Sequence, residues 1–346
     1  MTSKRRNECW PNILPPNYLF LLLRKIKRVL PMPQEPQPSN GRDNSLDFVK
    51  GVLIILMIAF HLVYIGDAYP YAKKVVYAFH MPGFLILSGY LMNISKPFRD
   101  FQKTILRFFI PYLTIESGYI LMASLLPIRE HIDMLTPAIF LEKLLLHPLG
   151  PYWYLHTLIL CGCAYYATHC IKSLQKGTRM FLFAAALAAL TLANGILAFP
   201  YALYFFIGTA IRQGGTKFNQ FFRASWIAIP AFFLLALNEK NLSTDCVKSL
   251  LLIYCALSAL LFLHQSVPGK IRIATVFLGK RTLPLYLYSP IFTFLCKPLS
   301  NLLSFDPTGM LFLIVSLALC IGGALTADAG IKWGTEKAKK LFAGHA

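Results

Sequence analysis

Two basic side chains near the start of the long apolar part of the chain have a spacing that could support chemistry. Lys50 and His61 are eleven residues apart. An α-helix turns about 1100° over that interval, so both side chains lie on one face, roughly 16 Å apart along the axis. Imidazole has a reference pKa near 6.5, so it exchanges protons near neutral pH. His61 is therefore a candidate general base, and Lys50 a candidate anchor for an anion.

A second histidine lies in the next apolar segment, beside residues that disturb helices. His80 precedes Pro82-Gly83, and an internal proline kinks or breaks a helix. Broken helices inside membranes usually line a cavity, so we expect His61 and His80 to share a polar chamber. Ionisable groups at such depth are costly and indicate function by default. The plainer alternatives are that His80 only caps the kink and that His61 only bonds a carbonyl near the interface.

Three further residues fit this chamber, and each also has a structural explanation. Glu116 lies in the middle of the third apolar segment, where it either enters the pocket or bonds a neighbouring helix. Arg107 belongs to a basic cluster that either binds an anion or sets the membrane orientation. Trp153 opens the fourth apolar segment, either as a pocket residue or as part of an interfacial aromatic belt.

The motifs around these residues occur together in one protein family. In chain order they are Asp47-x-x-Lys50-Gly51 followed by His61, Phe79-His80-Met81-Pro82 with Ser88-Gly89-Tyr90, Arg107-x-x-Ile110-Pro111-Tyr112, Trp153-Tyr154-Leu155, and Leu278-Gly279-Lys280-Arg281-Thr282-Leu283-Pro284-Leu285-Tyr286-Leu287. With these motifs the chain resembles the membrane-bound acyltransferase-3 family, in particular fucose 4-O-acetylase-like sugar acetyltransferases. The resemblance covers roughly residues 42–328, and the first two motifs are fairly specific in combination.

The resemblance implies an O-acetyltransferase. It implies transfer of an acetyl or other short acyl group from acyl-CoA, with acetyl-CoA as donor, to a hydroxyl of a cell-surface or lipid-linked glycan. His61 would take the hydroxyl proton, and His80 would position the acceptor or stabilise the oxyanion. A covalent acyl-histidine route stays open. No metal is expected.

The remaining site residues follow from the same picture. The expected ligands for the coenzyme A phosphates are cations at the inner face, namely Lys50, Arg107, Lys280 and Arg281. The candidates for the substrate pocket are Asp47, Glu116, Trp153, Tyr286 and Ser289. The chain departs from the family pattern at two positions: Ser289 stands where a histidine is frequent, and Thr104 where a second arginine is frequent.

The elements that must position these residues are membrane helices. Hydrophobic residues make up 56% of the 346 residues and charged residues only 14%, against about 25% charged in soluble domains. Lipid is therefore the expected solvent. The predicted fold is an all-α transmembrane bundle of about ten spans, near residues 46–65, 74–94, 106–126, 151–171, 180–195, 197–211, 224–237, 247–264, 282–300 and 309–328.

The basic charge follows the loops between these spans. Ten spans place 27 of the 34 Lys and Arg residues on the side of the N-terminus and seven on the other. Cytoplasmic loops carry such an excess, which predicts that both ends lie in the cytoplasm of a multi-pass cell (inner or plasma) membrane protein. The net charge of +19 is thereby explained by topology, and nucleic acid is excluded as a partner.

Three parts of the chain are expected. Residues 1–41 form a basic cytoplasmic extension with an interfacial helix near 18–30, residues 42–330 form the transmembrane acyltransferase domain, and residues 331–346 form a basic cytoplasmic tail. The eight cysteines lack paired spacing, so no disulfide is expected. A transporter or flippase for a glycan, lipid or small anion is the competing interpretation, and an inactive scaffold for polymer synthesis is a third.

Overall fold

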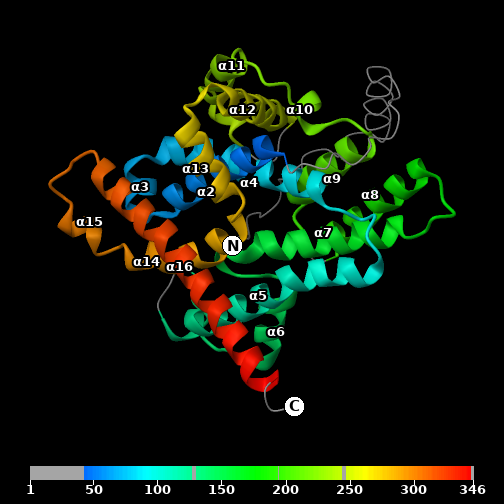
Figure 1. The fold of residues 1–346 in the computed structure, drawn as a ribbon, viewed down its shortest axis with the longest axis horizontal. Helices are drawn as coiled ribbons and strands as arrows, with labels where there is room; N and C mark the ends of the chain where they lie inside the picture. Colours follow the sequence, from blue (N-terminus) through cyan, green and yellow to red (C-terminus); the bar gives the residue numbers. More distant parts are fainter. Residues whose placement is uncertain (1–42, 127–129, 194, 244–246, 344–346) are drawn as a thin grey trace, which may run out of the picture. The chain divides into compact units, whose positions relative to one another are not determined.

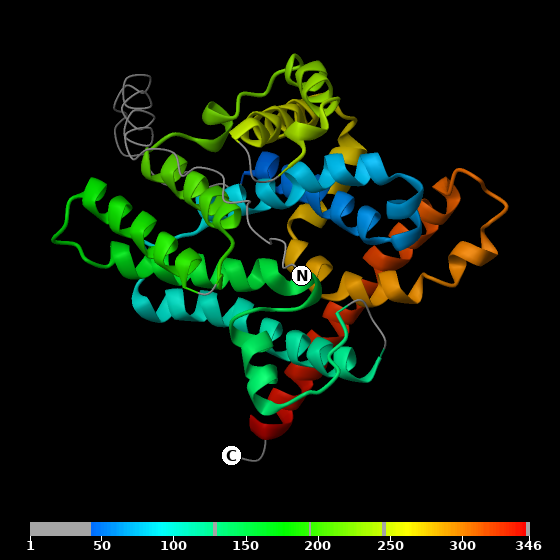
Figure 2. The ribbon, with the colours of Figure 1, turned by 180° about the vertical axis from the view of Figure 1, so that it is seen from behind.

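The structure is a computed structural model that describes residues 43–126, 130–193, 195–243 and 247–343 (Figures 1 and 2). Within these ranges the chain is all-helical and contains no strand, which confirms the all-α part of the predicted fold class. The predicted extension over residues 1–41 lies outside the described residues. The predicted tail continues the last helix as far as Ala343.

Each predicted span coincides with a helix, although several bounds differ by a few residues. These helices are α2 (Asn44–His61), α4 (Pro70–Leu91), α5 (Phe98–Leu125), α7 (Trp153–His169), α8 (Lys176–Leu192), α9 (Phe199–Gln213), α11 (Ala228–Ala236), α12 (Val247–Ser266), α14 (Thr282–Leu295) and α16 (Met310–Ala343). Shorter elements connect them, namely α3 (Val63–Ala68), α6 (Pro137–Leu145), η1 (Gly150–Tyr152), α10 (Phe218–Phe221), η2 (Glu239–Asn241), α13 (Gly269–Gly279) and α15 (Leu299–Leu302).

Within the described ranges, four helices are long and apolar enough to cross a membrane. They are α2, α5, α12 and α16. The nine residues of α11 rise only about 14 Å, less than half of the hydrocarbon thickness of about 30 Å. The helix bounds therefore support a membrane protein, while the number of ten crossings and the orientation of both ends stay predictions.

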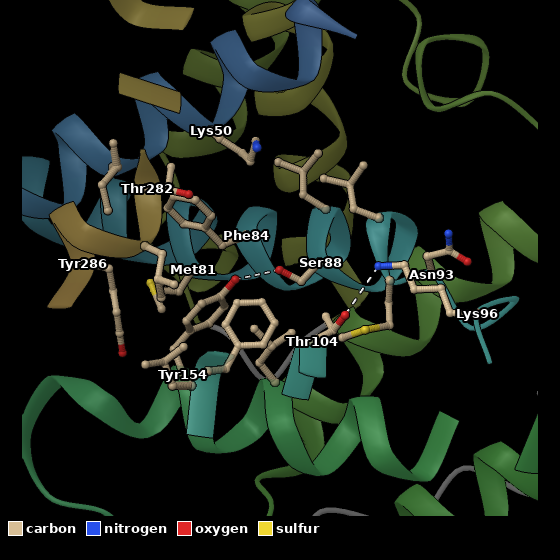
Figure 3. A pocket seen from close by; sticks show the side chains of 18 residues that line it. Lys50, Met81, Phe84, Ser88, Asn93, Lys96, Thr104, Tyr154, Thr282 and Tyr286 are labelled. Atoms are coloured by element: carbon tan, nitrogen blue, oxygen red, sulfur yellow. Dashed lines mark hydrogen bonds between the residues drawn. The ribbon is translucent and has the colours of Figure 1, made fainter. Parts of the chain in front are cut away.

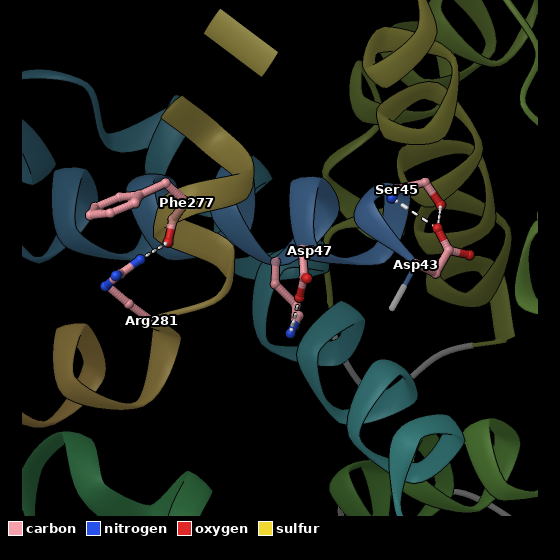
Figure 4. A network of polar contacts seen from close by, with 6 residues as sticks. Asp43, Ser45, Asp47, Phe277 and Arg281 are labelled. Atoms are coloured by element: carbon pink, nitrogen blue, oxygen red, sulfur yellow. Dashed lines mark hydrogen bonds and ion pairs between the residues drawn. The ribbon is translucent and has the colours of Figure 1, made fainter. Parts of the chain in front are cut away.

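Helix α2 lies at the centre of the fold and begins at a polar cap. The Asp43 carboxylate accepts hydrogen bonds from the Ser45 amide at 2.9 Å and from its hydroxyl at 2.6 Å. Figure 4 shows Asp43 and Ser45. The Asn219 side chain of α10 donates to both residues, at 3.2 and 2.9 Å. The helix is apolar on most sides and contacts α4, α12, α13 and α14, as expected for a helix buried inside a bundle.

Glycines allow two pairs of helices to approach closely around α2. A Cβ on Gly89 of α4 would lie 2.1 Å from the Phe205 carbonyl oxygen of α9, and one on Gly208 would lie 2.0 Å from that of Ile86. A Cβ on Gly279 of α13 would likewise meet the Asp47 carbonyl oxygen of α2, at 1.6 Å. Small residues at such contacts let membrane helices pack backbone to backbone. They fix α4 against α9, and the start of α14 beside Lys50.

A kink or a break was predicted at Pro82-Gly83, and the break does not occur. Helix α4 runs from Pro70 to Leu91 with Pro82 inside it. The proline removes only the amide that would bond to the Ala78 carbonyl. Membrane helices tolerate that loss because neighbouring helices and local adjustment satisfy the freed group.

Candidate active site

A cavity of about 240 Å³ contains both predicted catalytic histidines. We call it the histidine cavity; its lining comprises Met57, His61, Tyr77, His80, Met81, Pro82, Pro151, Trp153, Tyr201, Tyr286 and Pro290. The prediction that the two imidazoles share a chamber is therefore consistent with the geometry. The chamber forms where α2, α4, α7, α9 and α14 meet.

Each histidine is oriented by a hydrogen bond to its own helix. The His61 Nδ1 lies 2.7 Å from the Met57 carbonyl oxygen, and the His80 Nδ1 lies 2.8 Å from that of Val76. A carbonyl only accepts hydrogen bonds, so Nδ1 carries a proton in both rings. In the neutral form Nε2 then presents a lone pair. The His80 Nε2 is buried and has no hydrogen-bond partner among the described residues.

The Tyr77 ring packs near both imidazoles. Its centroid lies 5.8 Å from that of His61 and 5.1 Å from that of His80. The Tyr77 hydroxyl donates to the Phe60 carbonyl at 3.2 Å. This bond ties α4 to the C-terminal end of α2, so the spacing of the two imidazoles is set by a third aromatic ring.

Part of the lining of the histidine cavity is aromatic. Trp153 of α7 stacks on Tyr201 of α9 with centroids 4.2 Å apart and an interplanar angle of 20°. Both rings line the cavity. A planar aromatic surface of this kind offers a large contact area with polar edges.

A second cavity of about 250 Å³ contains Lys50 (Figure 3). We call it the lysine cavity; its lining comprises Lys50, Ile54, Met81, Phe84, Leu87, Ser88, Leu91, Met92, Asn93, Lys96, Thr104, Phe108, Tyr154, Leu155, Leu158, Thr282, Leu283 and Tyr286. Most of these side chains are apolar, and the two lysines supply positive charge. The Ser88 and Tyr154 hydroxyls bond to each other at 2.6 Å within it.

The two lysines have different partners. The Lys50 ammonium lies 2.7 Å from the Asp47 carboxylate on the preceding helical turn (Figure 4). The Lys96 ammonium donates to the Thr104 hydroxyl at 3.4 Å (Figure 3). Asp47 therefore orients Lys50 and is absent from the lining of the cavity. Thr104, at the position where the family often carries an arginine, is accompanied by Lys96.

Two side chains, Met81 and Tyr286, line both cavities. The Tyr286 hydroxyl donates to the Pro151 carbonyl, and its ring packs edge-on against Tyr154 at 5.4 Å and Tyr152 at 6.2 Å. The face of α2 predicted to lead from Lys50 to His61 lines two cavities instead of one. Lys50 and Ile54 line the lysine cavity, whereas Met57 and His61 line the adjoining histidine cavity.

Three of the four predicted phosphate ligands are not brought to the lysine cavity. Arg107, Lys280 and Arg281 are exposed and absent from its lining. The Arg281 guanidinium lies 3.7 Å from the centroid of the Phe277 ring and points away from Asp47 (Figure 4). Of the four cations, the structure supports Lys50 alone as a lining residue.

Glu116 and Ser289 are buried but lie outside both cavities. The Glu116 carboxylate accepts from the Leu149 amide at 2.6 Å, and the Glu130 carboxylate accepts from the next amide, that of Gly150, at 2.6 Å. Glu116 therefore holds the segment that leads into Pro151 and Trp153. For Glu116 the structural alternative fits better than a place in the pocket.

The sequence reasoning missed several lining residues. The sequence analysis used Lys96 only as one of the charges of a loop. It follows the Ser88-Gly89-Tyr90 motif closely, so it could have been considered as a site residue. Tyr201 and Met81 are uncharged near neutral pH, and the sequence reasoning did not identify them as lining residues. Their places depend on how α4, α7, α9 and α14 pack together.

The structure defines a class of protein: an all-helical membrane protein in which an imidazole pair adjoins a cationic, largely apolar cavity. A family profile described as an acyltransferase domain matches residues 43–327. The chain therefore belongs to the acyltransferase-3 family, a family of membrane-associated enzymes. The resemblance inferred from the motifs is confirmed.

Individual relatives match over short stretches. The chain is 50% identical over 64 residues to the nodulation protein NolL of Mesorhizobium japonicum, a match that covers 16% of this chain and 17% of that protein. It is 46% identical over 61 residues to the NolL of Sinorhizobium fredii, covering 15% and 16%. The chain thus spans about a sixth of the length of these relatives. No solved structure matches it.

Proposed function

We propose that this protein is an integral membrane O-acyltransferase. It transfers an acetyl or other short acyl group from acyl-CoA to a hydroxyl of a cell-surface or lipid-linked glycan. One observation carries the proposal: a single face of α2 presents Lys50 to one cavity and His61 to the adjoining one. A cationic anchor for the donor and a base for the acceptor are thereby held on one rigid element.

The donor fits the lysine cavity by its chemistry. Coenzyme A carries phosphates at one end and a thioester on a long, mostly apolar arm. Lys50 and Lys96 supply charge-assisted hydrogen bonds for phosphate, and Asn93 and Thr104 add polar groups. The remaining lining is apolar and suits the arm. Lys96 replaces Arg107, Lys280 and Arg281 in this assignment, since it lines the cavity.

His61 acts as general base. Its Nδ1 proton is committed to the Met57 carbonyl, so Nε2 takes the proton from the acceptor hydroxyl. The hydroxyl oxygen forms a bond to the thioester carbonyl carbon, and the carbon–sulfur bond then breaks. The proton passes from His61 to the leaving sulfur. The products are an ester and the free thiol of coenzyme A.

His80 positions the acceptor. The Val76 carbonyl holds its Nδ1 proton, so the neutral ring has a hydrogen-bond acceptor at Nε2 and no donor there. This geometry favours binding of a substrate hydroxyl over stabilisation of an oxyanion. A buried Nε2 without a protein partner is costly, and a hydroxyl of the acceptor satisfies it.

A sugar fits the aromatic side of the histidine cavity. Trp153 and Tyr201 stack on each other and line the same cavity as the histidines. The C–H faces of a sugar ring pack on aromatic rings, while its hydroxyls need hydrogen-bond partners such as Nε2 of His61 and His80. This supports a glycan as acceptor.

Ten crossings of the cell membrane, with both ends in the cytoplasm, bring the lysine cavity toward cytoplasmic acyl-CoA.

The test uses the purified protein in lipid nanodiscs with radiolabelled acetyl-CoA and a panel of glycans. We expect transfer of label to a glycan, and His61→Ala should lower the rate about 10²–10⁴-fold. His169→Ala is the matched control: His169 is buried, its Nδ1 bonds the Tyr165 carbonyl at 3.0 Å, and it lies outside both cavities. Substrate flux without consumption of acetyl-CoA would instead identify a carrier. Normal transfer by His61→Ala would remove His61 from the mechanism.

A further inference from the structure

The wall between the two cavities consists of unlike halves. Tyr286 is held by its hydrogen bond to Pro151 and by edge contacts to Tyr154 and Tyr152. Met81 has an unbranched side chain with three rotatable bonds and adapts to irregular spaces. Its side chain is buried, at 9% exposure. Tyr286 therefore forms the fixed half of the wall and Met81 the movable half.

The backbone of Met81 is well placed for such a role. It directly follows His80, whose Nδ1 is bonded to the helix, and directly precedes Pro82. The Met81 Cα is therefore fixed beside the histidine cavity, while the side chain reaches the boundary with the lysine cavity. Movement of the Met81 side chain would widen the boundary between the two spaces.

On the basis of the proposed function, we infer that Met81 is the partition that an acyl group passes to reach His61, and that its size limits the length of the acyl chain. A thioester whose phosphates lie at Lys50 and Lys96 must place its carbonyl carbon beside Nε2 of His61. The acyl chain is the far end of the donor, so it must first pass between Met81 and Tyr286. A small acyl group passes there, whereas each further methylene must displace the methionine further.

The test is a ratio of specificities. For the purified full-length protein in nanodiscs, kcat/KM is measured with butyryl-CoA and with acetyl-CoA. We expect Met81→Ala to raise the butyryl-to-acetyl ratio by at least roughly 10-fold, because a misfit of one methylene in a closed pocket costs roughly 10- to 200-fold. A ratio is insensitive to general loss of active protein.

Two methionines provide matched controls. Met57 belongs to the lining of the histidine cavity and Met92 to that of the lysine cavity, and neither is shared. Met57→Ala and Met92→Ala remove the same atoms but leave the partition in place, so we expect less than about a threefold change in the ratio. An equal rise in either control would show general loosening and would overturn the inference, as would an unchanged ratio in active Met81→Ala.

A second variant covers the case in which Met81→Ala does not fold. Met81→Phe narrows the passage, so acetyl transfer should fall about 10-fold or more while the Kd of desulfo-coenzyme A stays within about twofold. Transfer at the wild-type rate would overturn the inference. If the wild type neither transfers nor hydrolyses any acyl-CoA, the proposed function itself fails, and this inference with it. An active wild type with unaltered ratios rejects only the role of Met81.

Discussion

The hydrogen bond that each histidine makes to its own helix decides which ring nitrogen faces the substrate. For His80 the bond to Val76 leaves Nε2 free to accept. We expect His80→Ala to weaken acceptor binding by about 1–3 kcal/mol, because one hydrogen bond to a buried group is lost. Steady-state kinetics should show a raised KM for the glycan, with a KM for acetyl-CoA close to wild type. A change confined to the acyl-CoA parameters would contradict this assignment.

In the proposed function, two single residues, Lys50 and Lys96, bind the donor acyl-CoA. Lys50→Ala and Lys96→Ala should each raise the KM for acetyl-CoA roughly 10- to 160-fold, since each removes a charge-assisted bond to phosphate of about 1.5–3 kcal/mol. Lys332→Ala is a suitable control, because Lys332 also pairs with an aspartate, Asp328 at 2.6 Å, and lies outside the cavities. Equal effects of all three substitutions would indicate a general electrostatic effect.

Sequence reasoning succeeded for residues whose relation lies within one helix. Lys50 and His61 are eleven residues apart, and helix geometry alone shows that they share a face. It failed where direction depends on a neighbouring helix. On α5 the lining residues are Thr104 and Phe108, spaced by four, whereas Arg107 lies about 100° from Phe108 around the helix and is exposed. Only the packing of α5 shows which of these faces the cavity.

At the scale of elements, backbone contact between helices fixes the site. Gly89→Ala should destabilise the protein by about 1–3 kcal/mol, because its Cβ would lie 2.1 Å from the Phe205 carbonyl oxygen and force α4 away from α9. Gly118→Ala is the matched control, since no atom lies within 4 Å of its Cβ position. Thermal unfolding in nanodiscs measures both. A similar melting temperature for the two variants would show that the α4–α9 contact tolerates expansion.

The elements themselves were largely predictable, because runs of apolar residues and flanking charges mark membrane helices. In contrast, the sequence did not predict that α4 continues through Pro82. The effect of a proline depends on whether neighbouring groups satisfy the freed carbonyl, which a single sequence does not reveal. The short helix α6 is tied to α5, because the Tyr112 hydroxyl donates to the Leu144 carbonyl at 2.6 Å.

At the scale of the molecule, the orientation in the membrane is open to direct measurement. Ten crossings place the α7–α8 connection inside and the α11–α12 connection outside. A green fluorescent protein fused after Leu174 should fluoresce, and alkaline phosphatase fused after Lys240 should be active. Exchanging the two reporters should abolish both signals. Phosphatase activity at both positions would reject the ten-crossing arrangement.

One feature of α2 has a mechanical consequence. Lys50 and His61 belong to one uninterrupted helix, so no hinge adjusts the distance between them. In the proposed mechanism this distance sets how long the arm of the donor must be. A thioester on a shorter arm, held at the same lysine, stops short of the imidazole however well its acyl group would fit. Inserting one residue into α2 between them would swing the imidazole by about 100° out of register.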